Sequence, residues 1–177
     1  MPRRIPWPSG WGPRPLVEAV DGGFRVNLSR IEQRVLQQAF DDLRVMIVND
    51  DPSTKRLTPT AYVDDPALDE EYREMVGDDL QASQLAAFDV VEHSIDGSTV
   101  SRDELESWMR SVNAVRLVIG TQLDVGEERI EVDKTDPDYP RYVVYDFLSN
   151  LLAWIVDALQ STPPPDDPPH SPNDPNP

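Results

Sequence analysis

The chain has 177 residues, a formal net charge of −17 and no cysteine. That length allows one ordinary domain, and the lack of cysteine excludes disulfides, thiolate metal sites, a nucleophilic cysteine and thiol redox sensing. Because so acidic a chain repels phosphate backbones, we expect no direct nucleic-acid binding and favour a basic protein partner. The alternative is that the charge serves solubility alone.

Proline divides the chain into three segments. Thirteen of the 18 prolines lie in the first 15 or the last 17 residues. We expect a flexible N-terminal arm over residues 1–15, a single helical domain over 16–160 and a disordered proline-rich tail over 161–177, because both ends have too few apolar side chains to offset the entropy lost on ordering. In the arm, Trp7 and Trp11 are the groups expected to dock on another surface.

The domain is predicted to begin with a β-hairpin. Residues 16–20 and 24–28 flank the turn sequence Asp21-Gly22-Gly23, and apolar residues alternate with polar ones along the second segment. Ser29 and Glu32 then form a capping-box signature, which predicts a helix over residues 30–48. Its apolar positions at helical spacing are Ile31, Val35, Ala39, Leu43, Met46 and Ile47.

The next segment is predicted as a loop and two short helices. Residues 49–64 lack a sustained period, and we expect Leu57, Tyr62 and Val63 to hold this loop on the core. Asp65-Pro66 is typical of a helix start, and the first helix is predicted to end near Gly77. Asp78 or Asp79 then caps the second helix, which runs to the turn at Asp96-Gly97.

Two longer helices follow. Ser101 and Glu104 repeat the capping box, and a continuous apolar stripe predicts a helix that Gly126 closes. Residues 129–132 are expected to form a short strand returning to the hairpin. The last helix, from Tyr139 to about Gln160, is apolar on nearly every side, which suits the centre of a bundle or an interface.

The fold class predicted from these elements is mainly α (α+β), a bundle of about five helices with a small N-terminal β-hairpin. Asp146, Asn150 and Asp157 interrupt the last helix, so we expect no membrane span. With no apolar stretch typical of a signal peptide near the N-terminus, a cytoplasmic location is expected. We favour a monomer over a homodimer, with Trp154 largely buried in the bundle.

The residues needed for common enzymatic sites are missing. The two histidines are His93, at the end of a predicted helix, and His170, in the tail, so zinc sites and histidine-based triads lack their parts. Adjacent acids such as Asp41-Asp42 do not face one another on a helix. We therefore predict a non-enzymatic protein with no catalytic, cofactor-binding or metal-binding residues. A carboxylate-based enzyme is the least favoured alternative.

Three segments carry a resemblance to a known family. They are the sequence Arg56-Leu57-Thr58-Pro59-Thr60-Ala61-Tyr62 with the following Asp64-Asp65-Pro66 and Glu71-Tyr72-Arg73, the helix 101–123, and the helix 142–159. Over residues 24–159 the chain resembles an actinobacterial family of unknown function, that of the AosR-like oxidative-stress regulators. The resemblance implies a small, soluble, mainly helical and non-enzymatic protein.

The family's named activity is redox-responsive regulation of transcription, associated with an alternative sigma factor and dependent on a cysteine pair. Because this chain has no cysteine, a disulfide switch does not transfer. The function predicted is a regulatory protein-interaction domain that acts on transcription through a sigma factor or another basic partner. The alternative is a structural or adaptor protein that serves proteolysis or assembly.

Five residues in the matched motifs are candidates for a structural or partner-anchoring role. A guanidinium among apolar neighbours must find a polar partner, so Arg73 and Arg116 are expected either to form a buried ion pair that locks the loop at Tyr62 against the helix 101–123 or to anchor a partner. Trp108 and Tyr145 are expected in the core, with partner anchoring as their alternative role.

Overall fold

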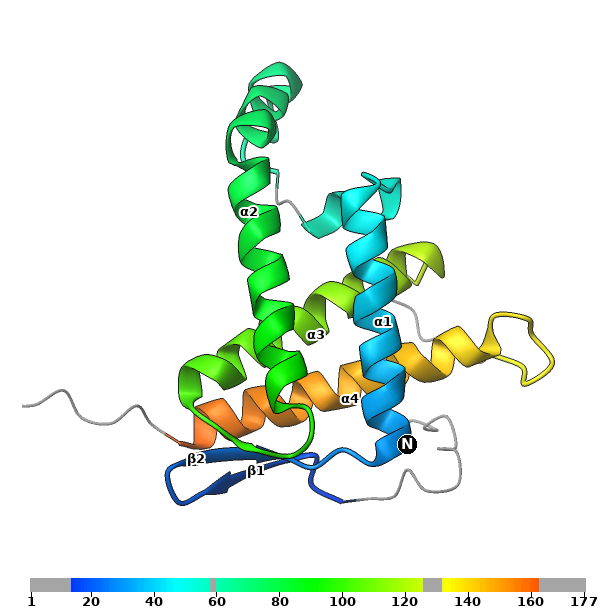
Figure 1. The fold of residues 1–177 in the computed structure, drawn as a ribbon. Coiled ribbons are helices and arrows are strands. Elements are labelled where there is room, and N and C mark those ends of the chain that lie inside the picture. Colours follow the sequence, from blue (N-terminus) through cyan, green and yellow to red (C-terminus); the bar gives the residue numbers. More distant parts are fainter. Residues whose placement is uncertain (1–13, 58–59, 126–131, 163–177) are drawn as a thin grey trace, which may run out of the picture.

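A computed structural model describes residues 14–57, 60–125 and 132–162 of the chain (Figure 1). The elements in chain order are β1 (Val17–Val20), β2 (Gly23–Val26), α1 (Arg30–Val48), the 3-10 helix η1 (Pro52–Leu57), α2 (Pro66–Ser94), β3 (Thr99–Val100), α3 (Arg102–Gln122) and α4 (Tyr139–Ser161). The described part therefore confirms a mainly helical fold with a small N-terminal antiparallel sheet.

The sheet extends the predicted hairpin by one strand. β1 and β2 pair antiparallel around the turn at Gly22, whose φ is +85°. A third strand, β3, pairs with the other edge of β2, so that Phe24 lies opposite Val100. A side chain at Gly23 would lie 2.3 Å from the carbonyl oxygen of Val100, so this close approach requires glycine. The strand predicted at 129–132 falls mainly outside the described residues, and β3 was not predicted.

Both capping boxes form as the sequence predicts. The Ser29 hydroxyl accepts the Glu32 N–H at 3.4 Å, while the Glu32 carboxylate accepts the Ser29 N–H at 2.6 Å. Ser101 and Glu104 make the equivalent hydrogen bonds at 3.3 and 2.7 Å. Reciprocal bonds of this kind satisfy N–H groups that a helix start leaves without partners, which explains why α1 and α3 begin at the predicted positions.

The two short helices predicted between Pro66 and Ile95 are a single helix of 29 residues, α2. Asp65 caps it by accepting the N–H of Leu68 at 3.1 Å, as expected. Gly77 lies inside this helix in open space and does not end it. A glycine in a helix interior costs only about 1 kcal/mol relative to alanine, and continued helical hydrogen bonding on both sides offsets that cost.

The core is centred on α3, which packs on both α2 and α4. In Figure 1, α1 and α2 cross over α3 and α4, with the sheet beside them. Phe40 of α1 stacks on Phe88 of α2 with ring centroids 5.0 Å apart. The largest fully buried side chains are Trp108, Phe40, Phe88, Phe147, Leu36, Leu43, Leu105, Leu148, Leu151 and Ile155.

The last helix does not lie at the centre of the bundle, which is one of the two positions that its apolar sequence suits. α4 buries Phe147, Leu148, Leu151 and Ile155, while Trp154 is 38% exposed. The reason is that α3 occupies the centre, so α4 has neighbours on one side and solvent on the other. Trp154 was therefore wrongly expected to be largely buried.

By length and composition alone, α4 is the one helix in the described part of the chain that could cross a membrane. Core helices pass the same test, and four apolar side chains of α4 have no solvent exposure because they pack in the common core. These contacts would be lost if α4 left the bundle.

Candidate functional site

Residues 60–79, a loop and the outer half of α2, form an extension that we name the acidic tip. In Figure 1 the outer end of α2 projects beyond the rest of the bundle. The acidic tip carries eight carboxylates and one arginine, a net charge of −7 within a chain whose net charge is −17. The first buried apolar side chain of α2 among the described residues is Ala87, well beyond the tip.

A buried carboxylate holds the loop of the tip in place. Asp69, which is 5% exposed, accepts the N–H groups of Ala61 at 2.7 Å and Tyr62 at 3.1 Å. Its second oxygen pairs with Arg73 at 2.8 Å, and Arg73 also donates to the hydroxyl of Thr60 at 3.3 Å. Asp69 and Arg73 thus fasten the loop to α2, and each satisfies the charge of the other.

This arrangement differs from the predicted ion pair. Arg73 binds a carboxylate of its own helix, so the loop at Tyr62 is locked to α2 and not to α3. Tyr62 and Val63, which were expected to hold the loop on the core, are exposed, whereas Leu57 does pack against it. The outer half of α2 carries the loop away from the core, and for that reason these side chains do not reach it.

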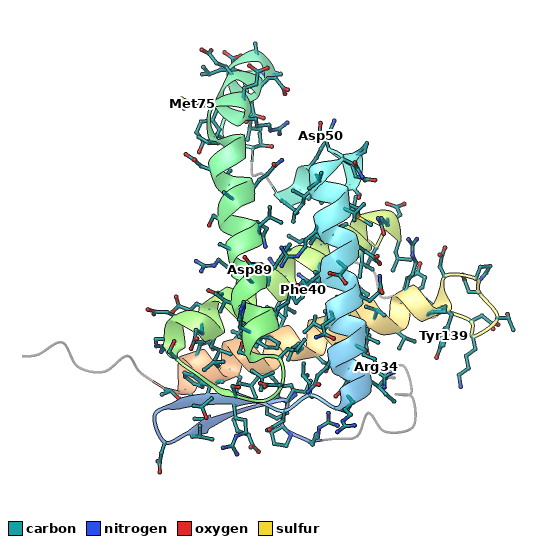
Figure 2. All side chains as sticks on the ribbon, in the orientation of Figure 1. Arg34, Phe40, Asp50, Met75, Asp89 and Tyr139 are labelled. Atoms are coloured by element: carbon teal, nitrogen blue, oxygen red, sulfur yellow. The ribbon has the colours of Figure 1, made fainter. Side chains whose placement is uncertain are left out.

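An apolar stripe runs along the acidic tip. Leu68, Tyr72, Met75 and Val76 are spaced by four, three and one residues, which puts them on one face of α2. Leu68 is 40% exposed and Met75 is 72% exposed, and Figure 2 shows Met75 on the projecting part of α2. The Tyr62 ring meets the Tyr72 ring edge-on, with centroids 6.0 Å apart. Glu70 and Glu74 lie on the opposite side of the helix, whereas Glu71, four residues before Met75, borders the stripe.

The remaining candidate residues lie elsewhere. Arg116 of α3 donates to the hydroxyl of Tyr145 on α4 at 3.3 Å, and its guanidinium lies 5.8 Å from the centre of that ring. It also donates to Asn113, and within the described residues it forms no ion pair. A cation-π contact therefore replaces the expected carboxylate. The Tyr145 ring packs so closely on Gly120 that an added Cβ would lie 3.0 Å from it.

Trp108 is a core residue. Its side chain is fully buried, and its indole N–H donates to the hydroxyl of Ser94 at 2.9 Å. The five candidates thus occupy three separate places: Tyr62 and Arg73 in the acidic tip, Arg116 and Tyr145 between α3 and α4, and Trp108 in the core. They do not form one site.

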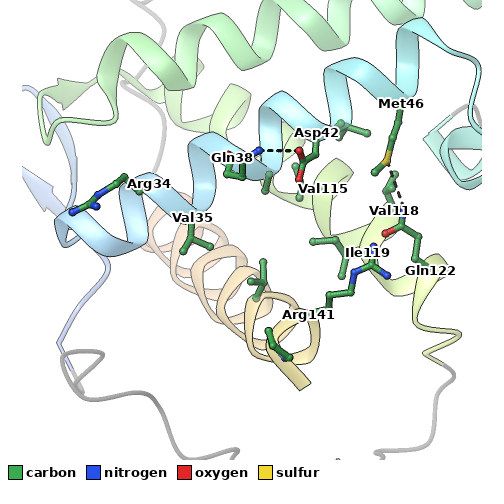
Figure 3. A pocket seen from close by; sticks show the side chains of 14 residues that line it. Arg34, Val35, Gln38, Asp42, Met46, Val115, Val118, Ile119, Gln122 and Arg141 are labelled. Carbon is green, nitrogen blue, oxygen red and sulfur yellow. Dashed lines mark hydrogen bonds between the residues drawn. The ribbon is translucent and has the colours of Figure 1, made fainter. Parts of the chain in front are cut away.

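An apolar groove of about 410 Å³ lies between α1, α3 and α4 (Figure 3). Its apolar wall consists of Val35, Ala39, Leu43, Met46, Val115, Val118, Ile119, Pro140 and Val144. Its polar rim consists of Arg34, Gln38, Asp42, Gln122 and Arg141. Gln38 donates a hydrogen bond to Asp42 at 2.9 Å. The rim contains both basic and acidic side chains, and it surrounds an apolar floor.

The groove was not predicted, although its signal is present in the sequence. Val35, Ala39 and Met46 were assigned to the core stripe of α1, but the fully buried side of α1 contains Leu36 and Phe40 instead. The apolar face of α1 is therefore wider than the core requires. Its surplus forms one wall of the groove.

Carboxylates are the most numerous charged groups of the chain. In the part of the chain that the structure describes, no three His, Asp or Glu side chains come together as a metal site. The pKa values of Asp51 and Asp96 are lowered by hydrogen bonds from the hydroxyls and N–H groups of Ser53 and Ser98. A general acid needs a raised pKa, so these carboxyls are unsuited to that role.

None of the curated proteins matches the chain, and none of the solved structures does. The family named Domain of unknown function (DUF2017) matches residues 14–159, from the first described residue to the last turn of α4. The narrower resemblance to AosR-like actinobacterial regulators stays a prediction. Because the match covers most of the sequence and all of its described helices, the chain belongs to the family Domain of unknown function (DUF2017).

Proposed function

We propose that the protein is a cytoplasmic, non-enzymatic interaction domain that binds a basic protein partner through its acidic tip. The observation that carries this proposal is the apolar stripe of the acidic tip, whose net charge is −7. Leu68 and Met75 of this stripe are exposed, and Tyr72 and Val76 are half-buried. Charged side chains are enough to keep a projecting helix end soluble, so solubility does not explain the apolar side chains of the stripe. Apolar side chains surrounded by charge are typical of a protein-interaction surface.

The two parts of this surface have different roles. The eight carboxylates attract a basic partner over about 10 Å at moderate salt and speed its association. The apolar stripe supplies contact area once the partner has docked, because burying exposed methyl, thioether and ring groups is favourable. The chemistry that fits both is an amphipathic segment, apolar on one side and rich in lysine or arginine at its edges.

The Asp69 and Arg73 contacts prepare the surface for binding. They hold the loop with Tyr62 against Tyr72, so the loop does not have to be ordered when the partner arrives. Binding to a surface that is already ordered loses less conformational entropy.

The partner class that we favour is a sigma factor or another basic component of the transcription machinery. This finer proposal is supported by the resemblance to AosR-like regulators. Binding at the tip requires no disulfide, which agrees with a chain that has no cysteine. An adaptor for proteolysis or assembly could use the same surface, and the identity of the bound protein distinguishes the two roles.

The test is capture of partners from a native lysate on the immobilised full chain, followed by mass spectrometry and titration calorimetry with the captured protein. The triple variant Glu70→Gln, Glu71→Gln and Glu74→Gln removes three charges from the tip. We expect it to weaken binding at least about tenfold, or about 1.4 kcal/mol, and to reduce the salt dependence of the dissociation constant.

The matched control removes three charges from the body, with Asp41→Asn, Asp103→Asn and Asp157→Asn, all at exposed positions. We expect this control to bind within about twofold of the unaltered chain, because binding depends on local charge. Equal weakening by both triple variants would show that net charge alone matters, and the proposed site would then be wrong.

A further inference from the structure

We propose that residues 1–13 of the same chain cover the apolar groove between α1, α3 and α4, with Trp7 and Trp11 as the anchoring side chains. The proposal concerns a different surface from the acidic tip and does not depend on it. It would make the groove an internal docking site.

The groove exposes apolar side chains that another segment or molecule could bury. Its floor is formed by Leu43, Val115 and Val118, while Val35 and Met46 of its wall remain partly exposed to solvent. The groove has a volume of about 410 Å³, and no described segment fills it. A contiguous apolar hollow of this size is unfavourable in water. Indole rings bury large apolar areas and suit such a hollow.

The first described residue fixes where the segment begins. Arg14 forms an ion pair with the buried carboxylate of Glu32 and donates to the carbonyl oxygen of Asn27 at 3.2 Å. Glu32 lies in the first turn of α1, two residues before Arg34, at which the groove starts. The N-terminal segment therefore joins the domain at one end of the groove.

The length of the segment matches the length of the groove. Along α1 the distance from Glu32 is about 9 Å at Gln38 and about 21 Å at Met46, at 1.5 Å per residue. The segment is rich in proline, and an extended polyproline chain rises about 3.1 Å per residue. Counted from Arg14, Trp11 can then reach about 9 Å and Trp7 about 22 Å. The two indoles correspond to the near and far parts of the groove.

Charge also favours this occupant. An extended chain that places Trp7 near Met46 puts Arg3 and Arg4 about 31 to 34 Å from Arg14, close to the end of α1. The helix ends at Val48, about 24 Å from Glu32, and Asp50 and Asp51 follow that end. The basic residues of the segment would thus meet carboxylates beyond the groove.

The C-terminal tail fits the groove less well. It leaves α4 after Thr162, whereas the groove meets α4 at Pro140, Arg141 and Val144, about 27 Å away along the helix. The residues after 162 also include no aromatic or large aliphatic side chain. The proposal replaces the expectation from composition that residues 1–15 form a free arm.

Disulfide trapping in the full chain tests the proposal, because the chain has no cysteine of its own. Ser9 lies between the two tryptophans, and at about 16 Å from Arg14 it is level with Asp42 on the exposed rim. The test variant is Ser9→Cys with Asp42→Cys. The control variant is Ser9→Cys with Asp157→Cys, at the other end of α4. Circular dichroism confirms that both variants fold.

Under mild oxidation at low protein concentration, we expect an intramolecular disulfide in the test variant at a yield at least about tenfold above the control. Adding Trp7→Ala and Trp11→Ala should reduce that yield to the control level. Equal yields in the two variants, or no disulfide in either, would overturn the proposal. Intermolecular disulfides in the test variant would show that a second copy covers the groove instead.

Discussion

The two halves of α2 differ in how much of their surface the rest of the molecule covers. From Leu85 to Ser94 the helix packs in the core, with Phe88 and Val91 fully buried. From Pro66 to Val76 it buries one side chain, Asp69, and leaves a stripe of apolar residues in solvent. One continuous helix therefore contributes to the core at one end and carries the proposed binding surface at the other. Substitutions in the two parts are expected to have correspondingly different effects.

Trp108→Ala is expected to have the largest effect on stability. The side chain is fully buried at the centre of the core, so its removal leaves a large cavity and should lower the free energy of unfolding by about 3 to 5 kcal/mol. Urea denaturation followed by circular dichroism measures this loss. Trp154→Ala is the matched control and should cost about 1 kcal/mol, because that ring is partly in solvent. Similar losses for both variants would contradict the central position of α3.

The two capping boxes provide a second matched pair. Glu32 is 1% exposed and also pairs with Arg14, whereas Glu104 is exposed to solvent. Glu32→Ala leaves Arg14 without its carboxylate and should cost about 2 to 4 kcal/mol in unfolding free energy. Glu104→Ala removes only a helix cap and should cost about 0.5 to 1 kcal/mol. Equal losses in urea denaturation would show that the buried ion pair adds nothing to the cap.

Asp69→Asn is expected to act locally, on the loop of the acidic tip. It weakens the pairing with Arg73 and the hydrogen bonds from Ala61 and Tyr62. Hydrogen exchange of these two amides should accelerate about tenfold, which corresponds to about 1.4 kcal/mol, while exchange in α3 stays unchanged. Glu70→Gln is the control, because Glu70 lies 3.9 Å from Arg73 and remains largely exposed. Faster exchange across the whole domain, including α3, would show that the tip is coupled to the core.

Met75→Ser should have the smallest effect on stability, within about 0.5 kcal/mol, because the side chain is 72% exposed on the projecting helix. The same substitution should weaken binding of a partner that uses the apolar stripe. A loss of unfolding free energy above about 2 kcal/mol would mean that Met75 packs in a core, since such losses come from buried side chains.

Much of the local structure was predictable because its causes are close together in the sequence. The Ser29 and Ser101 capping boxes are completed within three residues, and the Asp21-Gly22-Gly23 turn is bounded by alternating strands. The exception is α2. Gly77 was interpreted as a helix end. One glycine destabilises a helix by less than the hydrogen bonds around it stabilise that helix, so α2 continues through this position.

The candidate site was predictable only in part. Tyr62 and Arg73 were selected from their motif, and both lie in the acidic tip. The stripe from Leu68 to Val76 was missed because it becomes evident only once α2 is known to project from the bundle. The partner of Arg73 was also missed, since a carboxylate four residues away in the same helix competes with any distant one.

The sequence alone determines the helical class, the helix starts, the hairpin and the excess of negative charge. All of these depend on near neighbours or on composition. Only the packed structure shows that α3 and not α4 is central, that Leu36 and Phe40 face the core while Val35 and Met46 line a groove, and that half of α2 stands free. The physical reason is that periodicity identifies an apolar face but does not identify what covers it. Burial depends on neighbours that are distant in the chain and are brought together by folding.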